Sequence, residues 1–138
     1  RCGMSWDLSD AIAARAMCHA DNVYDIKNIR ITSLRCFTHT QSNTAFRGFG
    51  GPQGMLGMER VIDAVAHYLH LDPLLVRERN FYPHKHSKKL GVTPYGQRVK
   101  DCVIQEIVAE LLKTSQYSDR RKEIDSFNAT SRGRIVKA

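Results

Sequence analysis

Apolar side chains recur every three or four residues between positions 55 and 69, and this spacing constrains the fold more than any other feature. The residues are Met55, Met58, Ile62, Val65 and Leu69. At helical periodicity all five lie along one face, so the pattern predicts a long amphipathic helix that must bury that face. Pro52 suits the first turn of such a helix, because its missing N–H would have no partner there.

Four further helices are predicted where apolar residues recur at helical spacing or capping residues precede them. They cover residues 11–20, 73–82, 103–112 and a segment from Ser118 onward. Their expected starts follow residues 5–10, Asp72 and Ser118, which are of types that cap helices. In the last helix Ile124 and Phe127 are expected to face inward.

Residues 29–38 contain β-branched side chains in partial alternation and are predicted to form a strand. Val23 and Tyr24 are candidate pairing partners across the turn-like residues 25–28. Residues 84–97 are predicted to be loop; its histidines have no spacing that sets a metal-ligand geometry, so a solvated basic loop is favoured. The expected fold class is α+β, mostly helical, with a short strand pair.

Composition is that of a soluble globular protein, with 42% hydrophobic and 25% charged residues. No apolar run is long enough to span a bilayer, so membrane insertion is excluded. The net charge of +7 would suit an anionic partner, but the basic residues are scattered, so nucleic acid is not favoured. The cysteines at 2, 18, 36 and 102 lack zinc or disulfide spacing, so free thiols in a reducing cytoplasm are expected.

A glycine-rich stretch, AFRGFGGPQG at residues 45–54, precedes the long helix. Glycine permits positive φ and close approach of the backbone, yet each glycine costs entropy when it is ordered. One interpretation is a helix-entry loop whose phenylalanines fill the core. The other is a loop thinned to admit a flat ligand, with Phe49 stacking on the ligand and Arg47 and the loop amides facing its polar parts. A phosphate loop is disfavoured, because the glycine spacing does not fit and Pro52 removes an amide.

Arg15 breaks the pattern of the first helix. On a helical projection it falls, with His19, into an apolar arc formed by Leu8, Ala11, Ile12, Ala13, Ala16 and Ala20. A buried guanidinium is costly unless acceptors meet it. In one interpretation Arg15 pairs with an internal carboxylate, or its side chain extends past the alanines to reach solvent. In the other, Arg15 points into a cavity and donates to a ligand carbonyl or anion. His19 is expected to be a hydrogen-bonded core residue.

Three segments together resemble one family. The run TQSNTAFRGFGGPQG at residues 40–54, with RAMCHADN at 15–22 and RERNFY at 77–82, is similar to the xanthine dehydrogenase family of molybdenum hydroxylases. The resemblance covers nearly the whole chain and identifies residues 1–138 as a partial molybdenum-cofactor-binding domain. It implies an oxidoreductase that converts hypoxanthine and xanthine to urate at a molybdenum-molybdopterin centre. Electrons would then leave through [2Fe-2S] clusters and FAD, in other domains or subunits, to NAD.

The resemblance also implies roles for five residues. Arg15 would bind the purine's oxygen and stabilise the charge that develops during attack, and Phe49 would stack on the purine. Phe46, Arg47 and Gly48 would form the cofactor pocket, with Arg47 beside molybdenum through its backbone. The chain would supply one wall of the purine pocket, and its partners would be the purine, the remaining domain and the iron-sulfur/FAD subunit.

Several features depart from the family pattern. His39 stands where asparagine is expected and Phe37 where a basic residue is expected, which predicts a different packing of the strand before the loop. The chain opens on Arg1 and ends at residues 134–138, which resemble the start of a strand, and the family's two pocket glutamates fall outside it. We therefore expect a fragment that is inactive alone and that associates with itself through uncovered helix faces. Two alternatives remain open: a helical scaffold or basic binding piece, and a part of a related aldehyde oxidase.

Overall fold

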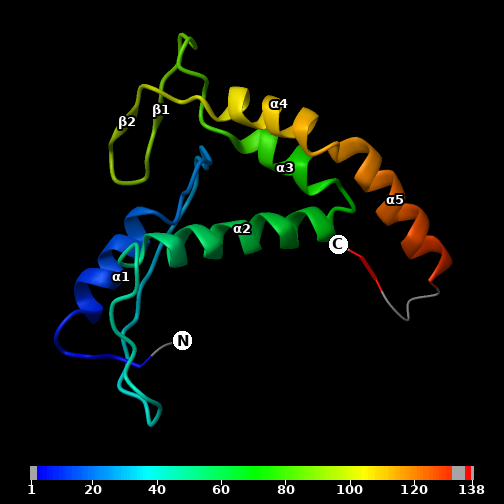
Figure 1. Cartoon of the computed structure of the whole chain (residues 1–138). Helices are drawn as coiled ribbons and strands as arrows, with labels where there is room; N and C mark the ends of the chain where they lie inside the picture. The colour runs from blue at the N-terminus through cyan, green and yellow to red at the C-terminus, as the bar shows by residue number, and fades with distance from the viewer. Residues whose placement is uncertain (1–2, 132–135, 138) are drawn as a thin grey trace. The chain divides into compact units, whose positions relative to one another are not determined.

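The computed structural model describes residues 3–131 and 136–137 and contains two compact units, residues 1–102 and 103–138. In the described part, the first unit holds α1 (Ser9–Cys18), α2 (Gly51–Tyr68), α3 (Pro73–Asn80), β1 (Gly91–Val92) and β2 (Arg98–Val99). The second unit holds α4 (Ile104–Thr114) and α5 (Tyr117–Thr130) (Figure 1). The mostly helical α+β class and all five predicted helices are confirmed.

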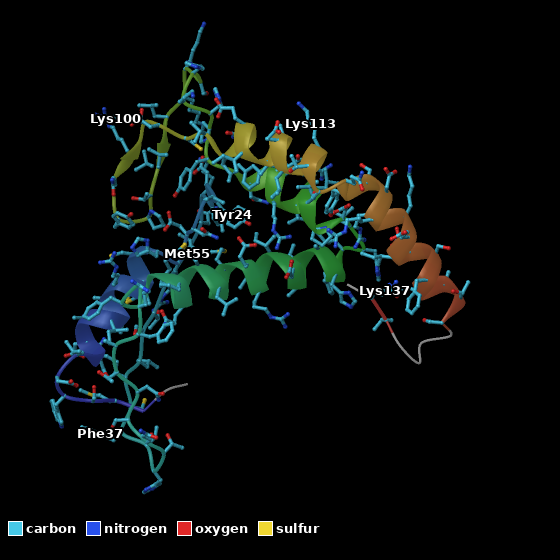
Figure 2. The ribbon with its side chains drawn as sticks, viewed as in Figure 1. Tyr24, Phe37, Met55, Lys100, Lys113 and Lys137 are labelled. Atoms are coloured by element: carbon cyan, nitrogen blue, oxygen red, sulfur yellow. The ribbon has the colours of Figure 1, made fainter. Side chains whose placement is uncertain are left out.

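The core of the first unit lies where α2 packs against α3 and the segment after α1. Its buried residues are Tyr24, Met58, Ile62, Ala66 and Val76. Figure 2 shows Tyr24 reaching into the space between α2 and α3. Of the predicted seam, Met55, Val65 and Leu69 keep 37%, 40% and 52% of their surface exposed. The helix is therefore amphipathic as predicted, but its buried stripe runs through positions spaced by four residues and is rotated from the predicted one.

Helix α3 begins as its capping residues predict. The Asp72 carboxylate accepts a hydrogen bond from the Leu74 N–H at 2.8 Å, and Pro73 occupies the first helical position. The helix ends at Asn80, and the next residue, Phe81, is extended. Phe81 forms an antiparallel bridge with Tyr24, and the two rings stack with centroids 5.9 Å apart.

In the second unit, α5 begins one residue before the predicted cap. Gln116 adopts a left-handed conformation with φ of 51°, and its carbonyl accepts hydrogen bonds from the N–H groups of Asp119 and Arg120, each at 3.1 Å. Ser118 therefore lies inside the helix and does not cap it, which corrects the prediction. Neither α4 nor α5 contains a buried residue. The strand expected at residues 134–138 falls largely outside the described residues.

The strand predicted at residues 29–38 belongs to no sheet within the described chain, and this prediction is wrong. Its backbone is extended without a neighbouring strand, and only Cys36 forms an isolated bridge, with Gly3. Tyr24 pairs with Phe81 instead of with this segment. A β-type sequence pattern sets which side chains alternate, but it supplies no pairing partner.

The sheet instead begins in the region predicted to be loop, residues 84–97, which contains β1, and β2 follows directly after it. Strands β1 and β2 pair antiparallel, and the turn between them is closed by the Thr93 N–H, which donates to the Gln97 carbonyl at 2.9 Å. The Gln97 N–H donates in turn to the Thr93 hydroxyl at 2.9 Å. Pro94 and Gly96, whose φ is 89°, are the turn residues that could have revealed this hairpin.

The described cysteines form no disulfide with one another. Cys18, Cys36 and Cys102 are free thiols. The described residues contain no group of three or more His, Cys, Asp or Glu side chains that could hold a metal ion. Among the same residues, no helix has the length and apolar character needed to cross a lipid bilayer.

Candidate functional site

The glycine-rich loop before α2 holds three consecutive residues in the left-handed backbone region. The φ angles are 90° at Gly48, 51° at Phe49 and 97° at Gly50. Gly48 has no room for a side chain, because an ideal Cβ would lie 2.5 Å from the Pro52 ring. Phenylalanine in this region costs about 1–2 kcal/mol. The Phe49 N–H donates to the Phe46 carbonyl at 2.9 Å, which helps to hold the strained turn.

Helix α1 packs against the start of α2 by direct backbone contact. An ideal Cβ on Gly50 would lie 2.2 Å from the Ile12 carbonyl oxygen, and one on Gly54 would lie 2.2 Å from the Ala16 carbonyl oxygen. Real Cβ atoms essentially never come within 3.0 Å of another heavy atom. Neither position can therefore accept a side chain unless the two helices move apart.

Arg15 lies on the exposed side of α1, which corrects the expectation that it sits in a buried arc. Ile12 and Ala16 instead lie against Gly50 and Gly54 at the start of α2. Alanine buries only one methyl group, so an arc defined mainly by alanines fixes only weakly which side of a helix faces inward. The Arg15 side chain makes no ion pair or hydrogen bond with another described residue. His19 is half-buried and packs its ring against Gly51.

The main chains of Arg15 and Phe49 are neighbours. An ideal Cβ on Gly50 would lie 3.1 Å from the backbone nitrogen of Ala16. That nitrogen is bonded to the carbonyl carbon of Arg15, and Gly50 directly follows Phe49. The contact between α1 and the loop therefore brings together the two backbone segments that carry the predicted purine-binding residues.

An apolar cavity of about 640 Å³ lies beside this contact in the first unit. Residues of α1, of the extended segment 31–35 and of the glycine loop line it, among them Ile12, Ala16, Leu34, Phe46 and Gln53. Of the five predicted site residues only Phe46 lines this cavity, and its side chain is 75% exposed. Arg15, Arg47 and Gly48 are exposed and Phe49 is half-buried, all four outside the cavity lining.

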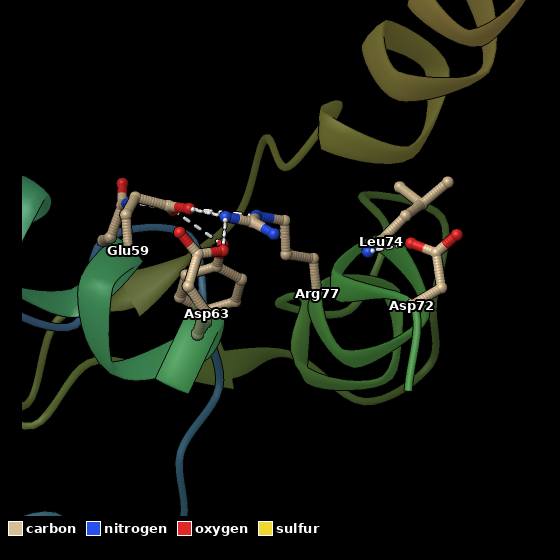
Figure 3. A network of polar contacts seen from close by, with 7 residues as sticks. Glu59, Asp63, Asp72, Leu74 and Arg77 are labelled. Carbon is tan, nitrogen blue, oxygen red and sulfur yellow. Dashed lines mark hydrogen bonds and ion pairs between the residues drawn. The ribbon is translucent and has the colours of Figure 1, made fainter. Parts of the chain in front are cut away.

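A polar network that sequence reasoning missed joins α2 to α3 and to the segment after α1 (Figure 3). The Arg77 guanidinium donates to Glu59 Oε2 at 2.8 and 3.0 Å and to Asp63 Oδ1 at 2.8 Å. Glu59 Oε1 accepts from the Tyr24 hydroxyl at 2.7 Å and from the Asn22 amide at 2.8 Å. Glu59 and Asp63 lie one turn apart on α2, and this pair of like charges was the available signal that a cation sits between them.

Burial and hydrogen bonding shift the pKa of three groups in this region. Burial and then the hydrogen bond to Glu59 raise the pKa of Tyr24. Burial and then the hydrogen bond to Asp21, at 2.7 Å, raise the pKa of Tyr82. For Arg77, burial alone lowers the pKa, but the hydrogen bonds to Asp63 and Glu59 outweigh it and raise the pKa. The tyrosines therefore remain protonated, as donors to carboxylates, well above neutral pH.

Comparison with known proteins gives the family. A family model described as a molybdopterin cofactor-binding domain matches residues 1–81. The chain belongs to the molybdopterin cofactor-binding domain family. It is 42% identical over 132 residues to a xanthine dehydrogenase of Calliphora vicina, covering 96% of the chain and 9% of that relative. It is 42% identical over 130 residues to xanthine dehydrogenase 1 of Arabidopsis thaliana, covering 94% of the chain and 9% of that relative.

A third relative, a xanthine dehydrogenase of Blastobotrys adeninivorans, is 40% identical over 128 residues, or 92% of the chain and 9% of that relative. The chain thus spans 9% of the length of these curated relatives. The match to the molybdopterin cofactor-binding domain includes α1, the glycine loop, α2, α3 and the Arg77 network. The resemblance found in the sequence is therefore confirmed.

Proposed function

We propose that the chain is part of a xanthine dehydrogenase that hydroxylates hypoxanthine and xanthine to urate, and that it forms one wall of the purine pocket. The observation that carries this proposal is the glycine contact between α1 and the loop, which sets the backbones of Arg15 and Phe49 side by side. The names of the relatives support the activity. Because the chain spans so little of their length, we expect it to be inactive alone.

The backbone chemistry of the loop fits a cofactor rich in hydrogen-bond acceptors. The N–H groups of Arg47, Gly48 and Gly50 donate to no other described residue. Those of Arg47 and Gly48 are consecutive, and successive N–H groups in a turn form anion-binding concavities. In the proposal, Phe46, Arg47 and Gly48 hold the molybdopterin cofactor, with Arg47 beside the metal through its backbone. When bound, the cofactor supplies the molybdenum centre at which a ring carbon of the purine is hydroxylated.

Arg15 and Phe49 act on the purine in this proposal. Arg15 donates to a purine oxygen and stabilises the negative charge that grows there during attack, which its planar set of donors suits. It can do so without breaking an existing ion pair, because none ties it to another described residue. Phe49 stacks on the purine ring, held by the backbone of its glycine neighbours.

The proposal places the chain within a larger cytoplasmic enzyme that also contains [2Fe-2S] clusters and FAD and delivers electrons to NAD. Large apolar side chains on the first unit support a covering partner: Trp6, Leu34 and Phe37 are 81%, 82% and 70% exposed. Figure 2 shows Phe37 at the far end of the connection between α1 and α2. The free thiols of the described cysteines are compatible with a reducing compartment.

The test is a chimera in which this chain replaces the matched 132 residues of the Calliphora vicina relative. Xanthine oxidation is followed by the absorbance of urate. Arg15→Ala is expected to lower kcat about 100-fold or more, as removal of a donor to a developing oxyanion does. Phe49→Ala is expected mainly to raise KM, by roughly 2- to 10-fold, since a stacking contact contributes about 0.5–1.5 kcal/mol. Arg60→Ala removes an exposed arginine from α2 and serves as the control.

Three outcomes would contradict the proposal. If Arg15→Ala and Phe49→Ala both oxidise xanthine at rates within twofold of the unmodified chimera, the two roles are rejected. If Arg60→Ala is as damaging as Arg15→Ala, the loss reflects charge rather than position. If the chimera oxidises aldehydes but not purines, the chain comes from a related aldehyde oxidase.

A further inference from the structure

The connection between α1 and α2 contains a segment whose backbone pairs with no other part of the described chain. Residues 29–35 make no backbone hydrogen bond to another described residue. Their side chains nevertheless alternate as in a strand: those of Ile29, Ile31 and Ser33 are half-buried, and those of Arg30, Thr32 and Leu34 are exposed. Unpaired strand edges are ready templates for the addition of another strand.

The apolar cavity runs along this segment. Residues 31–35 contribute one part of its lining, and α1 contributes another, which includes the small side chains Ser9, Ala13 and Ala16 beside Ile12 and Met17. Small residues leave space for the side chains of an occupant. A guest in this groove would therefore meet apolar surface on α1 and, on residues 31–35, N–H and C=O groups that bond to no other described residue, which together suit an extended peptide.

Strand pairing is already present where the segment ends. Gly3 forms parallel bridges with both Cys36 and Ser42. The Met4 N–H donates to the Cys36 carbonyl at 3.3 Å, and the Asn43 N–H donates to the Gly3 carbonyl at 3.0 Å. Gly3, Met4 and Asn43 also line the cavity. A strand added along residues 29–35 would thus continue a pairing that the chain has begun.

We infer that residues 29–35 are the acceptor edge for a β-strand supplied by the family polypeptide outside this chain. The relatives are long enough to supply it, because the chain covers 9% of their length. A second copy of this chain is a poorer occupant: antiparallel self-pairing about Thr32 and Ser33 sets Arg30 opposite Arg35, and like charges in that position repel. The fitting strand alternates apolar residues toward α1 and carries a carboxylate opposite Arg30.

Hydrogen exchange on the full chain tests the inference independently of any substrate. The probes are overlapping 15-residue peptides that cover the Calliphora vicina relative outside its matched region. Without a peptide, the amides of residues 29–35 are expected to exchange at nearly unprotected rates. A peptide with the alternating pattern should slow their exchange at least tenfold and leave the α2 core at 58–66 unchanged.

A pair of double variants isolates the main-chain contribution. Thr32→Pro with Ser33→Pro removes two N–H donors and should reduce the protection at least tenfold, whereas Thr32→Ala with Ser33→Ala keeps both donors and should retain it within threefold. Far-UV circular dichroism verifies folding, and if the proline pair unfolds, the exchange pattern of the unmodified chain decides alone. The inference is overturned if no peptide protects residues 29–35, if the proline pair retains the protection, or if protection follows self-association of the chain.

Discussion

Adding one methyl group at Gly54 should force α1 and α2 apart. The new Cβ would lie 2.2 Å from the Ala16 carbonyl oxygen, and ordinary contact begins at 3.4 Å, so the backbones must separate by 1.2 Å (3.4 minus 2.2). No side chain can move to relieve the clash, because the obstacle is main chain. Overpacking of this kind costs about 1–3 kcal/mol. Against this, alanine gains about 1 kcal/mol over glycine inside a helix.

Gly57 provides the matched control for Gly54→Ala. It lies on the same helix, and nothing stands within 4 Å of its ideal Cβ. Both substitutions gain the same helix propensity, so the difference in unfolding free energy between Gly54→Ala and Gly57→Ala isolates the clash, at about 1–3 kcal/mol. Urea unfolding followed by circular dichroism at 222 nm measures it. Equal stability of the two variants would show that α1 does not rest on Gly54.

Two more predictions concern the buried tyrosines and the Arg77 network. Tyr24 and Tyr82 have raised pKa values, so the folded chain retains protons that the unfolded chain releases above about pH 10, and the free energy of unfolding must fall as pH rises further. Each tyrosine lowers the free energy of unfolding by up to about 1.4 kcal/mol per pH unit in this range. Tyr24→Phe should remove the contribution of Tyr24, which urea titrations on either side of about pH 10 measure. An unchanged pH dependence would contradict the assignment. Arg77→Met leaves the carboxylates of Glu59 and Asp63 facing each other and should lower the free energy of unfolding by about 1–2 kcal/mol, a value that allows for their partial exposure. The control Arg60→Met should lower it by less than about 0.5 kcal/mol. Equal losses in the two urea melts would count against the network.

How far the sequence predicted the fold depended on whether a signal was local. Asp72 and Pro73 set the start of α3 through contacts within three residues, and that start was found. The strand pattern at residues 29–38 describes only one side of a pairing, so it could not say whether a partner is present. Pro94 and Gly96 are typical of a hairpin turn, but the basic residues before them led to the prediction of a solvated loop.

The candidate site divides in the same way. The family was identified from residues 40–54 together with 15–22 and 77–82. The need for glycine in the first of these segments is explained by contacts that no sequence pattern displays. The exposure of Arg15 was missed, because the small methyl groups of the alanines around it only weakly determine which side of α1 is buried. The ion pairs of Arg77 were missed because its partners lie on another helix: Asp63 is 14 residues away in the chain and Glu59 is 18 residues away. The roles of Arg15, Phe46, Arg47, Gly48 and Phe49 stay predictions until the chimera is assayed.

The junction between α1 and α2 is built unequally. On the α1 side the atoms nearest to Gly50 and Gly54 belong to the backbone of Ile12 and Ala16, and every amino acid possesses such a carbonyl oxygen. On the α2 side the contact requires residues without a side chain, and glycine is the one amino acid that meets this requirement. Over evolution, positions 12 and 16 should therefore tolerate substitution, whereas positions 50 and 54 should not. The two sides of one contact should thus differ in their rates of sequence change.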